Sequence, residues 1–190
     1  GLGISTGSIA QTTMTGPSTS HSPYMVPTVP GSTMTSILTV TESIGGYMLC
    51  GLGDGLGVYD NGGSTFTLLM NHEMGTTQGA THAHGQPGAF VSKWVINKSN
   101  LSVVSGADLI QNVYLWTGTT YTMYNATNTS TLTRFGRFCA ADLPEISAFY
   151  NAATGKGTQE RIFMNGEENG PEGRAFAHIS TGASAGDTYE

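Results

Sequence analysis

Hydrophobic and polar residues alternate with a period of two over several short segments, which is typical of strands with one buried face. In residues 65–71, for example, Phe66, Leu68 and Met70 fall on the same face. The sequence Asn-Gly-Gly-Ser at residues 61–64 comes directly before this segment, and Asn and Gly accept the positive φ of tight turns. The pattern therefore predicts a β-hairpin with its turn at residues 61–64.

A second hairpin is predicted around the polar sequence Asn-Lys-Ser-Asn at residues 97–100. In the strand that leads into it, Phe90, Trp94 and Ile96 would face the core. Ser92 would leave a small polar gap in that row.

Other apolar segments of strand length lie at residues 35–40, 109–116, 121–124, 132–135, 161–164 and 174–179. Only residues 141–150 suggest a helical turn, with Asp142 as a cap and Pro144 at an early position. No segment is long enough for the helix that connects parallel strands. The sequence therefore predicts an all-β fold: a sandwich, a barrel or a propeller.

Residues 1–33 differ from the rest of the chain, because they are rich in Gly, Ser, Thr and Pro and show little periodicity. Three prolines within residues 23–30 prevent a continuous hydrogen-bonded ladder there. The two interpretations are an extended N-terminal arm over the surface and a partly disordered segment. The whole chain of 190 residues has the length of one ordinary domain.

Charged residues make up only 11% of the 190 residues, against about 25% in an average soluble domain. The net charge is −6 and the seven basic residues are scattered, which excludes a phosphate-binding basic patch and hence a nucleic-acid partner. No run of 18 apolar residues exists, so no membrane-spanning helix is expected.

A secreted or cell-surface location is expected from several weak signals. Four Asn-x-Ser/Thr sequons begin at Asn97, Asn100, Asn125 and Asn128, although a Thr-rich chain produces such triplets by chance. A basic segment followed by an apolar one is missing at the N-terminus, so we expect that any signal peptide has been removed. The sequence does not decide the state of its two cysteines, which could form a disulfide, remain buried thiols or bind metal.

Three apolar segments run into polar, acidic ends, at residues 68–74, 135–142 and 161–170. Carboxylates at converging strand ends are oxygen ligands for Ca²⁺ and similar cations. Glu73 alone is commonly a solvated turn residue. For the adjacent Glu167 and Glu168, one side chain must point inward from a strand, and a buried carboxylate needs a cation partner.

Other residues carry competing interpretations. His82 and His84 would share one face of an extended segment and could bind a transition metal, but exposed histidines in a Gly-flanked loop are the commoner case. Cys139 is either a small buried hydrophobe or a soft metal ligand. The Gly-rich sequence at residues 51–57 precedes a strand instead of a helix, which excludes a dinucleotide loop and favours a sharp turn presenting Asp54.

At these residues the chain resembles the secreted alkaline phosphatases of the PhoX type. The resemblance rests on the order of short pieces at residues 54–60, 69–73 (Leu-Met-Asn-His-Glu), 84–85, 88–93, 139 and 165–169 (Asn-Gly-Glu-Glu-Asn). It implies a β-propeller whose central channel holds iron and calcium and which cleaves phosphate monoesters.

Carried onto this sequence, the resemblance implies that Cys139 is an iron ligand and that Glu167 or Glu168 binds the metal cluster. Glu73 would lie at or near the same channel. The spacing departs from the family pattern, since residues 140–160 look like an insertion. A propeller of this type needs several hundred residues, so we expect residues 34–190 to form its N-terminal part and the remaining ligands to lie beyond this sequence or on another chain.

The leading functional hypothesis is a metal-dependent extracellular phosphoric-ester hydrolase acting on a small phosphate ester. Its main rival is a non-catalytic surface or matrix protein that keeps the propeller and structural calcium. A third hypothesis, carbohydrate binding on Trp94 and Trp116, requires both indoles to be exposed, whereas the pattern turns Trp94 inward.

Overall fold

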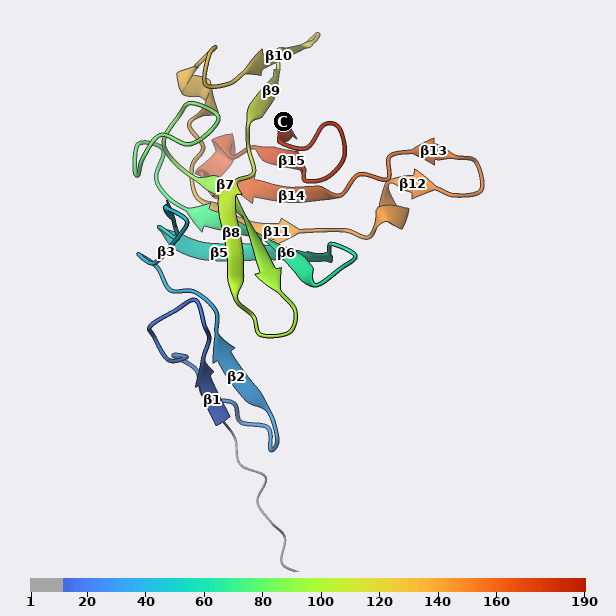
Figure 1. Cartoon of the computed structure of the whole chain (residues 1–190). Helices are drawn as coiled ribbons and strands as arrows, with labels where there is room; N and C mark the ends of the chain where they lie inside the picture. The colour runs from blue at the N-terminus through green and yellow to red at the C-terminus, as the bar shows by residue number, and fades with distance from the viewer. Residues whose placement is uncertain (1–11) are drawn as a thin grey trace, which may run out of the picture.

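The computed structural model describes residues 12–190, which form strands joined by turns (Figure 1). The all-β prediction is confirmed. Helical structure in these residues is limited to three short 3-10 turns, at Thr131–Thr133, Ile146–Ala148 and Gly170–Glu172. The described residues contain no helix with the length and apolar character to cross a membrane.

The strands form five sheets, of which three have only two strands. The strands are β1 (Thr12–Thr15), β2 (Thr33–Ser36), β3 (Ser43–Ile44), β4 (Tyr47–Met48), β5 (Leu52–Asp60), β6 (Thr65–Glu73), β7 (Phe90–Asn97), β8 (Val103–Asp108), β9 (Asn112–Trp116), β10 (Tyr121–Tyr124), β11 (Phe138–Asp142), β12 (Tyr150–Asn151), β13 (Lys156–Gly157), β14 (Ile162–Glu167), β15 (Ala175–Ile179) and β16 (Asp187–Tyr189).

The largest of the three N-terminal sheets is an antiparallel meander of β5, β6, β7 and β8. Both predicted hairpins are confirmed. Gly62, in the first turn, has a φ of 78°, which Gly adopts without strain. In the second hairpin Leu101 takes the left-handed conformation, with a φ of 61°.

The C-terminal sheet has six strands in the order β10-β9-β16-β15-β14-β11. Its neighbours are antiparallel except β16 and β9, which run parallel. The short β12–β13 hairpin projects away from this sheet (Figure 1).

The main hydrophobic core lies between these two sheets. Leu69 and Val91 come from the four-stranded sheet, and they belong to one buried cluster with residues of the C-terminal half: Ile110, Val113, Leu115, Phe135, Phe138, Phe163 and Phe176. The sheets approach closely where β5 lacks side chains. A Cβ on Gly55 would lie 2.6 Å from the carbonyl oxygen of Cys139, so only glycine allows β5 to lie beside β11 at this point.

The other face of the four-stranded sheet carries the predicted row of Phe66, Leu68 and Met70. These side chains pack with buried Trp94 and Ile96 against the segment of residues 37–49. The predicted core orientation of Trp94 is confirmed, since only 2% of it is exposed.

The N-terminal arm contains one paired strand. β1 pairs in parallel with β2, which joins the arm to the residues that follow position 33. The prolines at 23, 27 and 30 lie in the loop between these strands, where no ladder is required. The strand predicted at residues 35–40 ends earlier, at Ser36, because Ile37 and Leu38 pack onto the sheet instead. Residues 1–11 of the arm lie outside the described residues.

The helical turn predicted for residues 141–150 is displaced. Ala141 and Asp142 belong to β11, where they pair with Asn165 and Met164, so Asp142 caps nothing. The 3-10 turn begins only after Glu145.

None of the sheets formed by residues 12–190 closes on itself. The propeller within the all-β prediction therefore stays a proposal.

Candidate metal centre

Three strands, β6, β11 and β14, bring most of the predicted ligands to one place. Glu73 ends β6, and β5 pairs alongside it with Leu52 opposite Glu73. On the other sheet Phe138 at the start of β11 pairs with Glu167 at the end of β14. Because β5 lies against β11, the end of β6, the start of β11 and the end of β14 meet at one edge between the sheets.

Three potential ligand atoms converge at this edge. The carboxylates of Asp54 and Glu73 and the thiol of Cys139 lie within 4.8 Å of one another. A carboxylate oxygen of Glu168 lies 3.2 Å from the Cys139 sulfur, which donates its proton to it. Glu73, Cys139 and Glu168 were all predicted as ligands, and they share one site. We refer to Asp54, Glu73, Cys139 and Glu168 as the acidic cluster.

Arg137 compensates part of the negative charge of the acidic cluster. Its Nε donates to Glu73 at 2.7 Å, its Nη2 also contacts Glu73, and the same nitrogen lies 3.5 Å from Glu168. The Arg137 side chain is 56% exposed, so it can move without disturbing the core. One guanidinium against three carboxylates leaves the cluster with a negative charge.

The environment keeps Cys139 protonated in the metal-free chain. Burial, the hydrogen bond to Glu168 and the negative charges of Glu168, Glu73 and Asp54 raise the pKa of the Cys139 thiol to about 12. A cation bound among these groups would oppose the same charges, and a coordinating thiol loses its proton. The donor set of three carboxylates and one thiol therefore suits the calcium and iron implied by the resemblance.

Glu167 points to the other side of β14, so the structure does not bring it to the acidic cluster. Its side chain, 2% exposed, accepts hydrogen bonds at 2.8 and 2.9 Å from Arg174 and one at 2.9 Å from the backbone N–H of Gly136. The prediction that one of the two glutamates faces inward is confirmed. The inward residue, Glu167, pairs with Arg174, and the outward residue, Glu168, joins the acidic cluster.

Sequence reasoning missed Asp54 and Arg137 as members of the site. The Gly-rich segment around Asp54 is not a sharp turn as predicted; it is part of β5, with an irregular register between Gly53 and Leu56. Glycines within a strand signal a bulge or a close backbone approach, and this signal was available at residues 51–57. No sequence signal distinguishes Arg137 from the other basic residues.

Both cysteines are free, so the disulfide alternative is excluded. His72 is fully buried: its Nδ1 donates to the carbonyl of Cys50 at 2.6 Å and its Nε2 accepts from Ser92 at 2.7 Å. The polar gap predicted at Ser92 is therefore filled by this contact.

A buried chain of side-chain hydrogen bonds supports the backbone of Cys139. Thr188 donates to His178, His178 donates to Asn165 at 2.9 Å, and Asn165 donates to Asn71 at 2.9 Å. The Nδ2 of Asn71 then donates to the carbonyl of Cys139 at 3.0 Å and to that of Ala140 at 3.3 Å. This series of hydrogen bonds crosses from the six-stranded sheet to β6 of the four-stranded sheet, so it fixes the position of β11 relative to both sheets.

Asn71→Leu is expected to lower the free energy of unfolding by about 2–4 kcal/mol, because it leaves Asn165 and two β11 carbonyls unpaired and buried. Urea denaturation of the variant measures this. The control is Asn100→Ala, at an exposed residue that accepts one hydrogen bond from Ser102, where a loss below about 1 kcal/mol is expected. Equal losses in the two variants would show that the buried chain contributes nothing.

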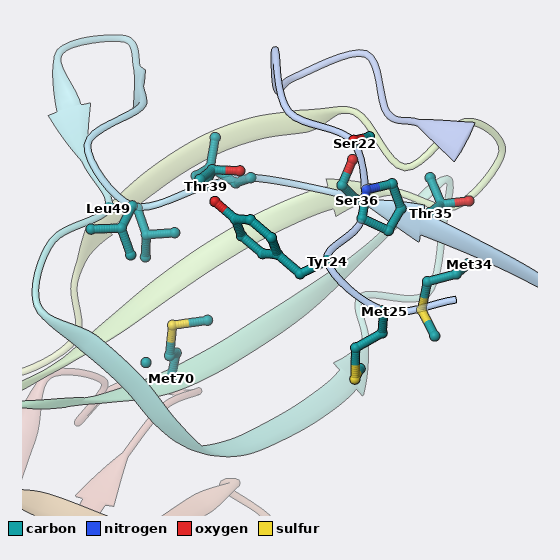
Figure 2. Close-up of a pocket in the computed structure, with 13 residues that line it drawn as sticks. Ser22, Tyr24, Met25, Met34, Thr35, Ser36, Thr39, Leu49 and Met70 are labelled. Atoms are coloured by element: carbon teal, nitrogen blue, oxygen red, sulfur yellow. The ribbon is translucent and has the colours of Figure 1, made fainter. Parts of the chain in front are cut away.

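An apolar groove lies between the N-terminal segment and the four-stranded sheet (Figure 2). Tyr24, Met25 and Met34 line it from the N-terminal arm, and Leu49 and Met70 line it from the sheet side. The groove has a volume of about 520 Å³, and no acidic, histidine or cysteine side chain lines it. It therefore offers no ligand to a metal ion.

No protein-family model matches the chain, and neither does any curated protein or solved structure.

Proposed function

We propose that this chain forms the metal-binding part of an extracellular, metal-dependent phosphoric-ester hydrolase. The observation that carries the proposal is the convergence of Asp54, Glu73 and Cys139 within 4.8 Å, with Glu168 in contact with the thiol. Four residues with metal-binding chemistry come from, or directly follow, four separate strands, in a chain that has only 13 acidic residues. Arg137 compensates only part of this negative charge, and a bound metal cation would compensate the rest.

The strand arrangement supports a propeller as the scaffold. β5 to β8 form a four-stranded antiparallel sheet, and β11, β14, β15 and β16 are four neighbouring antiparallel strands of the six-stranded sheet. Their first strands, β5 and β11, lie side by side. Propeller blades are four-stranded units placed around a central channel. In that arrangement the acidic cluster would face the channel.

In this proposal Asp54, Glu73, Cys139 and Glu168 would hold calcium and iron. Bound cations of this kind neutralise phosphate oxygens and polarise an oxygen nucleophile. Arg137 would bind the substrate, since an exposed guanidinium donates paired hydrogen bonds to phosphate oxygens. The buried Asn71 would keep the Cys139 backbone in position.

The test combines metal analysis with an assay of phosphate-ester hydrolysis. The purified protein is expected to retain iron and calcium and to hydrolyse a chromogenic phosphate monoester. Chelation should abolish turnover, and adding back both metals should restore it. Hydrolysis that persists in chelator, or a protein that retains neither metal, would refute the proposal.

The ion pair between Arg137 and Glu73 favours a second candidate, a non-catalytic surface protein in which the cluster is structural. There Arg137, alone or with calcium, would neutralise the carboxylates and join the two sheets. Calcium retention without iron and without turnover would favour this candidate.

A further inference from the structure

His82 and His84 lie in the loop that connects β6 and β7. Sequence analysis favoured two exposed histidines, and the structure corrects this: the His82 side chain is 8% exposed and His84 is fully buried. Their rings lie among aromatic neighbours, since His82 stacks on Phe90 with 3.7 Å between centroids and His84 contacts Phe135. Buried polar atoms normally have a hydrogen-bond partner, so the partner of each ring nitrogen in these two imidazoles has to be identified.

Each imidazole uses one ring nitrogen to bind an oxygen. His82 Nδ1 lies 3.3 Å from a carboxylate oxygen of Asp108, and His84 Nε2 lies 3.1 Å from the carbonyl of Thr133. An oxygen acceptor requires a proton on the nitrogen that faces it. In a neutral ring the lone pair therefore lies on the opposite nitrogen, which is Nε2 of His82 and Nδ1 of His84.

These two opposite nitrogens have no partner. In the part of the chain that the structure describes, they are the only buried side-chain nitrogen or oxygen atoms without a hydrogen bond. An imidazole whose other nitrogen is fixed by a carboxylate or a carbonyl is the usual form of a metal-binding histidine. Burial also lowers the pKa of His84 to about 4, which keeps its ring neutral at physiological pH.

We propose that His82 Nε2 and His84 Nδ1 bind, from opposite sides, a transition-metal ion that prefers imidazole and square-planar geometry, of which Cu²⁺ is the member of highest affinity. The ring centroids lie 6.3 Å apart. With nitrogen–metal distances of about 2 Å, two imidazoles on opposite sides of one ion have centroids roughly 6 Å apart, whereas two at a tetrahedral angle have centroids roughly 5 Å apart. This site is separate from the acidic cluster and does not rest on the proposed hydrolase.

Asp108 supplies the compensating charge. It receives hydrogen bonds from the Tyr47 hydroxyl at 2.6 Å and from the backbone N–H of Ala83 at 2.7 Å. Burial opposes its ionisation, but these bonds and His82 hold the pKa of Asp108 below its usual value. In residues 12–190 no third His, Cys or carboxylate residue forms a metal-binding group with these two histidines.

The experiment is a Cu²⁺ titration followed by electron paramagnetic resonance. It uses a Glu73→Gln/Cys139→Ser background, which removes ligands of the acidic cluster. One equivalent of Cu²⁺ is expected to show coupling to two imidazole nitrogens. His82→Asn and His84→Asn should each lose that coupling, and Asp108→Asn should weaken binding by about 10- to 100-fold. The matched control is His21→Asn, at an exposed histidine, which should change nothing.

The result that would overturn the proposal is Cu²⁺ bound without imidazole coupling, or coupling that survives in both histidine variants. A crystal structure of copper-treated protein with a water molecule bridging the two nitrogens would overturn it equally. If a histidine variant fails to fold, the coupling measured in the folded background protein still decides the question.

Discussion

Glu168→Gln is expected to lower the affinity for calcium and iron by at least about 100-fold, which is the upper end of the loss caused by removing a ligand's supporting partner. Hydrolysis of a phosphate ester should fall with it. The reason is that Gln keeps the shape of the side chain but removes the charge beside the Cys139 thiol. Because the Glu168 side chain is 64% exposed, stability should change little. Calorimetric titration with each metal measures the affinity.

Glu167→Gln is the matched control, because it removes the carboxylate of the neighbouring residue, which lies outside the acidic cluster. Glu167→Gln leaves Arg174 without its carboxylate at a site where the glutamate side chain is buried. Because Arg174 is partly exposed, we expect a loss of about 2 kcal/mol, below the range for fully buried pairs. Metal affinity of the folded fraction should remain unchanged.

The two variants are therefore expected to have opposite effects. Glu168→Gln lowers metal affinity and leaves stability nearly unchanged, whereas Glu167→Gln lowers stability and leaves metal affinity unchanged. If Glu167→Gln removes the metal and Glu168→Gln does not, the assignment of these two residues is wrong. If neither variant changes metal affinity, the acidic cluster is not the metal site.

The second large effect expected is destabilisation in mild acid. Burial lowers the pKa of His72 and of His84 to about 4 and that of His178 to about 3. The unfolded chain keeps histidine pKa values near 6.5. Between pH 6.5 and about 4 the unfolded state therefore binds more protons, and the free energy of unfolding falls as the pH decreases.

The stabilisation from neutral histidines is complete above pH 6.5 and is lost progressively below it. At pH 5 we expect a loss of about 1–2 kcal/mol per histidine, or about 3–6 kcal/mol for all three. Urea denaturation from pH 7 to pH 5, in the presence of chelator so that metal binding does not contribute, measures the slope.

His178→Asn should reduce that slope by about a third, whereas His21→Asn, at an exposed position, should not change it. Slopes are compared because His178→Asn also removes hydrogen bonds and lowers stability at every pH. A free energy of unfolding that is constant from pH 7 to pH 5 would show that these histidines are already protonated in the folded protein.

Local sequence patterns determined much of the first sheet. The turn at residues 61–64 follows from Asn and Gly that accept positive φ, and the face carrying Phe66, Leu68 and Met70 follows from the two-residue period. The same period requires Glu167 and Glu168 to point to opposite sides. Which of them faces the core depends on the register of β14 with β11 and β15, and this register involves residues far away in the sequence.

Local propensity failed where a tertiary contact was stronger. Asp142 and Pro144 fit a helix start, but pairing of Ala141 with Asn165 draws this segment into β11. The Gly-rich sequence around Asp54 fits a turn, but its glycines let β5 lie against β11. For His82 and His84 the flanking glycines suggested exposure, but His82 stacks on Phe90 and His84 packs against Phe135, and both rings are buried.

By itself, the sequence determined that this protein is built of strands and which residues have the chemistry to bind metal, because strand periodicity and side-chain chemistry are local properties. Only the tertiary structure decided that Asp54 and Arg137 join Glu73, Cys139 and Glu168, and that Glu167 pairs with Arg174 instead. Convergence of this kind depends on how two sheets pack and on the register of strands distant in sequence, and neither is encoded in any single segment.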